Sequence, residues 1–252
     1  MNNKILKVRE LLKNSSGQAI NICIIDSGIE LSHDWINIKF LKTYKLTNKT
    51  ENEYKIIEST KVTDPIGHGT AISFLISKIA PNARIFHIKT FDRNEEEFDK
   101  FFFALQWLYL QQKQNNIRCD ILNLSLGFNN ENLLEKMEDI LSKLKETMIV
   151  LPYNNYHHRL KKTINIEISK KLKSAFQIEI IDYKKLLIGA LGENIPVPWK
   201  ENSYARVSGK SYACSIFTGL LARLKEKFRI NTIEELEILI YKLLKEGEKR
   251  IK

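Results

Sequence analysis

The sequence is poor in the features that mark secreted, disulfide-rich or zinc-binding proteins. It has three cysteines in 252 residues, and no two of them have the spacing of a zinc site or a redox pair. An odd and sparse set of thiols fits a reducing compartment. We therefore expect reduced thiols in a cytoplasmic protein, at Cys23, Cys119 and Cys214.

Long apolar runs are missing as well. A membrane helix needs roughly 18 or more nearly continuous apolar residues, and the apolar stretches around 20–25 and 216–224 are shorter or interrupted. In residues 1–13, basic residues alternate with Ile, Leu and Val, so the continuous apolar segment of a secretion signal is absent. We expect residues 1–18 to form a helical extension, with no signal peptide or prosegment.

Nothing in the sequence divides the chain into separate units. Its 252 residues, 43% of them hydrophobic, can bury a core without disulfides or metals. With 5 prolines and 10 glycines, it shows no Pro/Gly-rich linker, internal repeat or low-complexity tract. We predict one domain over residues 1–252.

The charge is one-sided, with 40 Lys and Arg against 30 Asp and Glu and a net charge of +10. Such an excess can favour nucleic acid, an anionic membrane surface or an acidic peptide, and it can also be a solvated surface only. The net charge alone does not decide among these possibilities. A nucleic-acid-binding protein remains an alternative that rests on charge alone, because no recognisable binding motif accompanies it.

The hydrophobic pattern alternates between strands and helices. Five short, β-branched, almost unbroken apolar segments are typical of strands buried on both faces of a parallel sheet: Ile20–Asp26, Arg84–Thr90, Asp120–Ser125, Thr147–Leu151 and Leu186–Leu191. Helical spacing is found in Thr70–Ile79, Phe98–Gln112, Asn132–Glu146, Ser211–Phe228 and Ile233–Lys245. The alternation predicts an α/β fold, a doubly wound and mainly parallel sheet with helices on both faces. The polar stretch Thr43–Thr60 predicts an inserted hairpin.

Three short motifs fall where such a sheet gathers functional groups, beyond the carboxyl ends of its strands. Asp26 ends the first strand in IIDSG, His68 opens a helix in DPIGHGT, and Ser211 begins a helix in SGKSYA. The glycines beside His68 let backbone pass close to a neighbouring loop or substrate. Taken singly, each residue has a plainer role: Asp26 as a turn residue, His68 as a structural histidine, Ser211 as a helix N-cap. Together, in this order, they form a constellation with a low chance rate.

These motifs resemble the D-S/T-G, H-G-T and G-T-S-x-A signatures of the subtilisin-like serine peptidases, the subtilase family. The order Asp, His, Ser separates this family from the chymotrypsin-like and α/β-hydrolase orders. The resemblance covers residues 20–224 and implies a subtilisin-like fold, a catalytic triad of Asp26, His68 and Ser211, and peptide-bond hydrolysis through an acyl-enzyme. It implies no cofactor for the chemistry. Structural calcium is frequent in the family, but no complete set of oxygen ligands can be assigned here.

Two further segments extend the resemblance. ILNLSLG over 121–127 is similar to the family's N-x-S-L-G strand, which implies that Ser125, Leu126 and Gly127 pair with the substrate backbone. Without the resemblance it reads as a core strand. MIVLPYNN over 148–155 resembles the strand that ends in A-A-G-N, which implies that Asn155 donates to the oxyanion, with Asn154 as the fallback.

The sequence also departs from the family pattern. Lys210 stands where the signature has Thr, and Ser215 stands where the family generally has Pro. These departures bear on substrate preference and activation, while the three reacting side chains are present.

The resemblance raises a question about restraint. Only 25 residues precede Asp26, which leaves no room for a signal and a folding prosegment, and an unrestrained general protease damages its own cell. We therefore expect narrow specificity, such as removal of a leader segment from a ribosomally made precursor peptide, or activation by a partner. The alternative is a catalytically silent peptide-binding or regulatory module of the same fold. A lost triad residue would mark that alternative, and none is lost.

A cluster of cations lies beside these motifs. Between residues 157 and 173 six cationic residues accompany one acid, Glu167, and Lys210 adds a further charge beside Ser211. The six are Arg159, Lys161, Lys162, Lys170, Lys171 and Lys173. A field of one sign draws in oppositely charged peptides. We expect a substrate with an acidic segment, although the stretch can also be a solvated helix face that points elsewhere.

Overall fold

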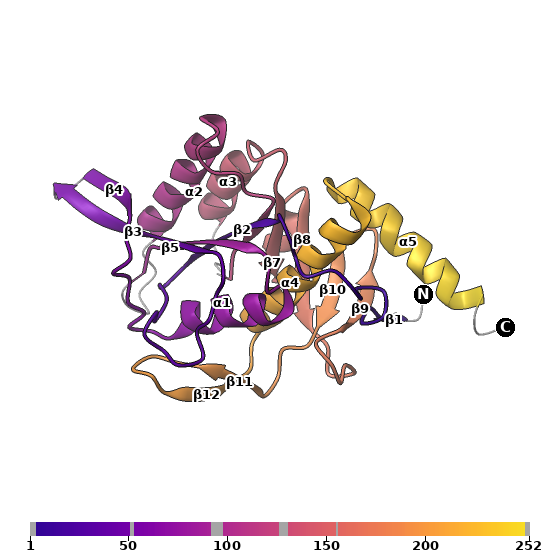
Figure 1. The fold of residues 1–252 in the computed structure, drawn as a ribbon. Helices are drawn as coiled ribbons and strands as arrows, with labels where there is room; N and C mark the ends of the chain where they lie inside the picture. Colours follow the sequence, from indigo (N-terminus) through magenta and orange to yellow (C-terminus); the bar gives the residue numbers. More distant parts are fainter. Residues whose placement is uncertain (1–3, 51–52, 92–97, 126–130, 155, 250–252) are drawn as a thin grey trace.

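The computed structural model describes residues 4–50, 53–91, 98–125, 131–154 and 156–249. In these ranges the chain forms a ten-stranded sheet of order β1-β9-β10-β8-β7-β6-β2-β5-β3-β4 and a two-stranded sheet of β11 and β12 (Figure 1). The strands are β1 Lys4–Lys7, β2 Asn21–Asp26, β3 Leu41–Thr50, β4 Glu53–Glu58, β5 Arg84–Lys89, β6 Ile121–Asn123, β7 Met148–Pro152, β8 Thr163–Ile168, β9 Gln177–Asp182, β10 Leu187–Ala190, β11 Ile195–Pro198 and β12 Tyr204–Val207. The helices are α1 His68–Ile79, α2 Phe98–Lys113, α3 Glu131–Leu141, α4 Lys210–Phe228 and α5 Ile233–Lys249, with a 3₁₀ turn at His157–Arg159.

The centre of the large sheet is parallel, from β10 through β8, β7, β6, β2 and β5 to β3. Antiparallel strands extend it at both ends, with β4 beside β3 and with β9 and β1 beyond β10. Strand β2 is buried along its whole length, as expected of a parallel strand with both faces covered.

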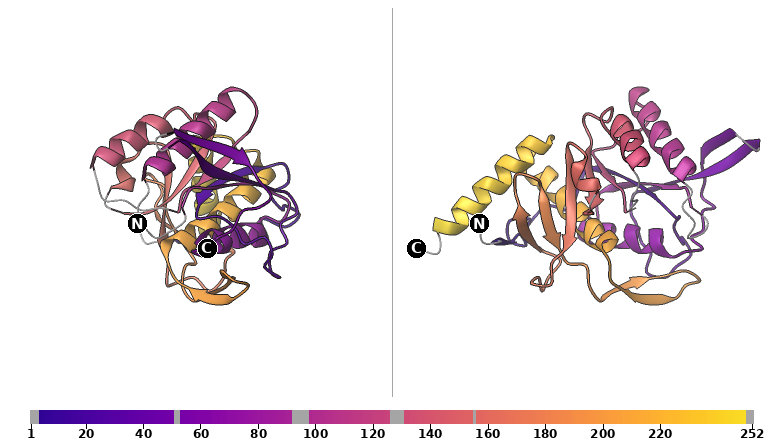
Figure 2. Two further views of the ribbon diagram at one scale, coloured as in Figure 1. Left: turned by 90° about the vertical axis from the view of Figure 1, so that its left-hand side faces the viewer. Right: turned by 180° about the vertical axis from the view of Figure 1, so that it is seen from behind.

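Helices cover both faces of the sheet (Figure 1). Successive side chains of a strand point to opposite faces, and in β2 Ile22 and Ile24 join a core with α1, α4 and α5, while Cys23 and Ile25 join a second core with α2 and α3. The β11–β12 hairpin lies along the outer side of α1 (Figure 2). The predicted fold class is therefore confirmed, as are the five predicted strands, the five helices and the hairpin, to within a few residues at their ends.

The predicted N-terminal helix is wrong. Residues Lys4–Lys7 form β1, which pairs antiparallel with β9, and the chain then makes hydrogen-bonded turns such as Leu12 N–H to Val8 O, 2.9 Å. The reason is tertiary: β9 offers unpaired backbone groups at the end of the sheet, and a short segment with alternating side-chain burial satisfies them. Four basic residues among apolar ones fit either structure, so the sequence does not decide between them.

All three cysteines are unbridged and buried. Burial raises the pKa of the Cys23 and Cys214 thiols well above the usual value. In both residues the protonated thiol therefore packs as a small apolar side chain.

No helix in the described ranges combines the length and the apolar character that crossing a bilayer requires.

The topology places the sequence motifs at one edge of the sheet. Asp26 ends β2, Ser125 follows β6, and Tyr153 follows β7, and these three strands run parallel to one another. Helices α1 and α4 begin at the same edge, with His68 and Lys210 as their first residues. Their N-termini therefore face the site that the next section describes.

Candidate active site

Asp26 and His68 form the charged half of the site. His68 Nδ1 lies 2.8 Å from Asp26 Oδ1, and the same oxygen accepts the Ser27 N–H at 2.8 Å. The side chain of Asp26 is 2% exposed and that of His68 23% exposed. The Asp26 carboxylate is therefore buried, whereas the His68 imidazole is partly exposed to solvent.

The pair shifts both pKa values in the directions that a general base needs. Burial is the largest single influence, raising the pKa of Asp26 and lowering that of His68. The charge and hydrogen bond that the two groups share outweigh it, so the pKa of Asp26 lies below its usual value and the pKa of His68 lies above. The site thus holds an ionised carboxylate beside an imidazole that accepts a proton readily.

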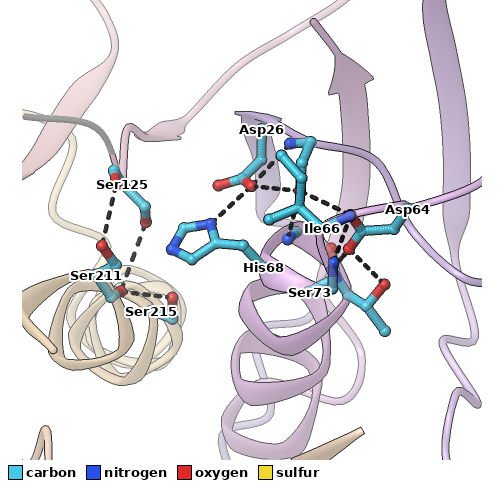
Figure 3. Close-up of polar contacts among 12 residues, drawn as sticks. Asp26, Asp64, Ile66, His68, Ser73, Ser125, Ser211 and Ser215 are labelled. Atoms are coloured by element: carbon cyan, nitrogen blue, oxygen red, sulfur yellow. Dashed lines mark hydrogen bonds and ion pairs between the residues drawn. The ribbon is translucent and has the colours of Figure 1, made fainter. Parts of the chain in front are cut away.

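Asp64 is a second buried carboxylate, which shapes the loop before His68. Its two oxygens accept hydrogen bonds from Ser27 Oγ, Ile66 N, Gly67 N, Thr70 N and Thr70 Oγ1, at 2.7–3.2 Å (Figure 3). Three of these donors are backbone N–H groups in the first turn of α1 or just before it, where the helix itself offers no acceptor. The charge of Asp64 also contributes to the raised pKa of His68. Asp64 stands in the same DPIGHGT motif as His68, but no role was predicted for it from the sequence.

Close contacts explain why glycine stands on each side of His68. Gly67 has a φ of +89°, and a Cβ there would lie 2.7 Å from the Trp199 ring. A Cβ on Gly69 would lie 2.2 Å from the carbonyl oxygen of Gly28 and 2.9 Å from His87. The expectation that backbone passes close to the flanking glycines therefore holds at both positions.

Gly69→Ala is expected to destabilise the protein by about 3 kcal/mol, because backbone atoms that cannot rotate away must move. Gly209→Ala is the matched control, since its φ of 164° is extended backbone and its nearest new contact is an ordinary 3.4 Å to Tyr212. Urea unfolding of both variants measures the difference. Equal midpoints for the two variants would contradict this account of Gly69.

A second buried histidine, His87 on β5, does not compete with His68 as a base. It is fully buried, its Nδ1 lies 2.8 Å from Ser73 Oγ, and burial lowers its pKa to about 4. At neutral pH it is therefore a neutral packing residue beneath the site.

Ser211 lies on the opposite side of the His68 ring from Asp26, at the start of α4 (Figure 3). Helix α4 begins at Lys210 with Gly209 as its N-cap, so Ser211 is not the cap residue. Its Oγ donates to the carbonyl oxygen of Ser125 at 3.0 Å. No hydrogen bond joins Ser211 to His68, both of which are described residues, and Figure 3 shows the second ring nitrogen turned toward Ser211.

Hydrogen bonds connect the Ser125 segment to α4. Asn123 Nδ2 donates to Ser125 Oγ at 2.9 Å, and Thr218 Oγ1 donates to Asn123 Oδ1 at 2.9 Å. The end of β6 is thus held beside Ser211. The other two residues predicted to pair with substrate, Leu126 and Gly127, lie outside the described residues.

Of the two oxyanion candidates, Asn155 also lies outside the described residues. Asn154 is described, and its Oδ1 accepts the backbone N–H groups of Tyr156 at 2.9 Å and His157 at 2.6 Å. This is a capping role, which fixes the turn after β7. Asn154 therefore has a structural function in the chain directly before Asn155.

In the part of the chain that the structure describes, no three His, Cys, Asp or Glu residues gather in a way that could hold a metal ion.

Comparison with known proteins places the chain in a family. A sequence profile of the subtilase family matches residues 17–153, which include the Asp26 and His68 motifs. A comparison with curated proteins gives no match.

Solved structures share the fold at low sequence identity. Sphericase superposes with a TM-score of 0.68 at 20% identity, over 92% of this chain and 87% of its own. A cold-adapted subtilisin-like serine proteinase gives 0.65 at 18% over 89% and 81%, and the prenylagaramide maturation protease PagA gives 0.63 at 16% over 90% and 84%. At such identities the likeness shows the fold.

The sheet, the sequence profile and the paired Asp26 and His68 define a protein of the subtilisin-like class. The chain belongs to the subtilase family. It is a serine-type endopeptidase, a hydrolase whose substrate is a peptide or protein.

Proposed function

We propose that this chain cleaves peptide bonds with Asp26, His68 and Ser211 as its catalytic triad. The observation that carries the proposal is the 2.8 Å contact of His68 Nδ1 with buried Asp26, with Ser211 on the other side of the imidazole (Figure 3). The test is peptide cleavage followed by mass spectrometry, in which the wild-type protein cuts and Ser211→Ala does not.

In the proposed reaction His68 takes the proton of Ser211 Oγ as the oxygen attacks the peptide carbonyl. His68 then returns the proton to the leaving amine, and water releases the acyl group in a second round. Asp26 orients the ring and stabilises the imidazolium. Ser211 Oγ must first turn from the Ser125 carbonyl to the imidazole, and catalytic hydrogen bonds often form only in the substrate complex.

Two groups are proposed to stabilise the tetrahedral oxyanion: the Asn155 side chain and the Ser211 backbone N–H. Ser211 is the second residue of α4, so its N–H has no partner within the helix. The helix N-terminus also favours a developing negative charge. The substrate backbone is proposed to pair with the segment 125–127, by strand addition. No cofactor takes part in these steps.

Narrow specificity is part of the proposal, with removal of a leader from a precursor peptide as the role. One of the structural neighbours is a maturation protease, which supports a maturation role as a proposal for this chain. A cytoplasmic location also belongs to the proposal, and three buried, unbridged cysteines agree with it.

The predicted acidic substrate segment has a weaker basis in the structure than in the sequence. Four of the cations have acidic partners: Arg159 pairs with Glu131, Lys170 with Glu193, Lys171 with Glu179, and Lys210 with Glu167. Lys161 and Lys162 precede β8 and so lie toward the amino ends of the parallel strands, away from the site. We retain the acidic preference as a proposal and expect its size to be modest.

The acidic preference predicts a salt effect. An acidic peptide should show a kcat/KM several-fold above that of a matched basic peptide at low salt. The difference should shrink as the screening length falls from about 30 Å at 0.01 M salt to about 8 Å at 0.15 M. Steady-state rates across a salt series measure it. Equal rates for both peptides at every salt concentration would remove the charge proposal and leave the triad standing.

A further inference from the structure

Lys210, the residue directly before Ser211, connects three elements of the site. Its Nζ lies 2.8 Å from the carbonyl oxygen of Tyr153 and 2.8 Å from Glu167 Oε2. It also lies 5.4 Å from the centre of the Tyr153 ring. Tyr153 directly follows β7, Glu167 belongs to β8, and Lys210 opens α4. One ammonium group thus joins the ends of two strands to the start of the nucleophile's helix.

Stability alone does not account for this arrangement. A cation in the first turn of a helix meets the unfavourable end of the helix dipole. The side chains of Lys210 and Glu167 are 38% and 30% exposed, and ion pairs so open to water contribute little. The bond to the Tyr153 carbonyl is different, because it fixes the backbone rather than a mobile side chain.

The backbone that Lys210 holds is the one that leads to the proposed oxyanion donor. The Tyr153 carbonyl is two residues before Asn155, and Asn154 between them caps the turn that follows. The second proposed donor, the Ser211 N–H, lies on α4 directly after Lys210. Lys210 therefore ties the backbone two residues before Asn155 to the helix turn that carries the Ser211 N–H.

We propose that Lys210, held by Glu167, is a positioning residue that sets the separation of the two oxyanion donors. It does so by tying the end of β7 to the first turn of α4. The inference rests on the proposed function and deepens it. Lys210 acts through the Tyr153 carbonyl and does not touch the reacting atoms.

Lys210→Met tests this proposal in the full chain. The expected result is a fall in kcat of about 10- to 100-fold, the scale that small misplacements of catalytic groups produce, with KM changed less than about 3-fold because the oxyanion forms only in the transition state. Lys210→Arg should recover most of the rate, since its guanidinium can reach both acceptors. Lys143→Met is the control: this lysine, just after helix α3, pairs with Asp139 at 2.7 Å and is 44% exposed, and its removal should leave kcat unchanged.

A double-mutant cycle with Asn155→Ala separates positioning from a general loss of structure. If Lys210 works by placing Asn155, then Lys210→Met should cost less than about 3-fold in a protein that already lacks the Asn155 side chain. Losses that multiply would overturn the proposal, as would a wild-type kcat for Lys210→Met. If Lys210→Met does not fold, Glu167→Gln takes its place in the same cycle, with the same expectations.

The outcomes also distinguish this inference from the proposed function. Cleavage that survives in Ser211→Ala would refute the triad. An inactive Ser211→Ala beside a fully active Lys210→Met would refute the positioning role only. If Asn155→Ala itself costs nothing, the oxyanion assignment fails and the positioning role fails with it.

Discussion

Ser211→Ala is expected to lower kcat by about 10⁶-fold, the scale of loss when a triad that works as one unit loses its nucleophile. Its Oγ is the only atom removed, and it donates one hydrogen bond, to the Ser125 carbonyl. The fold should therefore be retained. Initial rates on a cleavable peptide, with melting temperatures as the control for folding, measure the effect.

His68→Ala should cost a similar factor, because without the imidazole the Ser211 proton has no acceptor. Asp26→Ala should cost about 10⁴-fold, since the base remains without its orienting partner. Combining either change with Ser211→Ala should add almost nothing. Losses that multiply across the three positions would show that these residues do not act together.

Asn155→Ala is expected to lower kcat by about 10²- to 10³-fold, which corresponds to about 2.7–4 kcal/mol of lost transition-state stabilisation. KM should change little, because the bond to the oxyanion is made mainly in the transition state. Steady-state kinetics on one peptide substrate provide the measurement.

Asn154→Ala is the matched control for this prediction. It removes a side chain whose oxygen accepts two backbone N–H groups in the turn after β7. The loss of a capping bond should appear chiefly as about 1 kcal/mol of stability. If Asn154→Ala instead gives the large kcat loss and Asn155→Ala does not, the alignment with the family motif is displaced by one residue.

The Asp26, His68 and Ser211 motifs could be found in the sequence because the residues proposed to react lie in short, distinctive segments. Gly69 is an example. A side chain there would clash with the Gly28 carbonyl, so the close packing of the site requires glycine at this position. The buried strand β2 is similar, since a parallel strand covered on both faces must be apolar throughout.

Other parts of the fold have no comparable pattern in the sequence. Strand β8 lies within the charged stretch 157–173 and was not predicted, although its residues alternate between polar and apolar. Strand β9 and the β11–β12 hairpin were likewise not predicted. β1 was predicted to be helical because a segment of four residues fits either period, and its pairing with β9 depends on partners at least 170 residues away.

The polar contacts that organise the site were the least predictable. In the sequence Lys210 is a further positive charge beside Ser211, whereas in the structure Glu167 pairs with it from β8. Asp64 accepts hydrogen bonds from Ser27 and from its own loop. Such pairings follow from how the strands are ordered in the sheet, and local sequence does not encode that order.

The measurement that tests the central claim most directly is covalent labelling with a fluorophosphonate, which reacts with a serine hydroxyl activated by a neighbouring base. The triad account predicts one label per chain, located on Ser211 by peptide mass spectrometry, and no label on Ser211→Ala or His68→Ala. Labelling of wild-type protein at another residue, or equal labelling of folded Ser211→Ala, would contradict it.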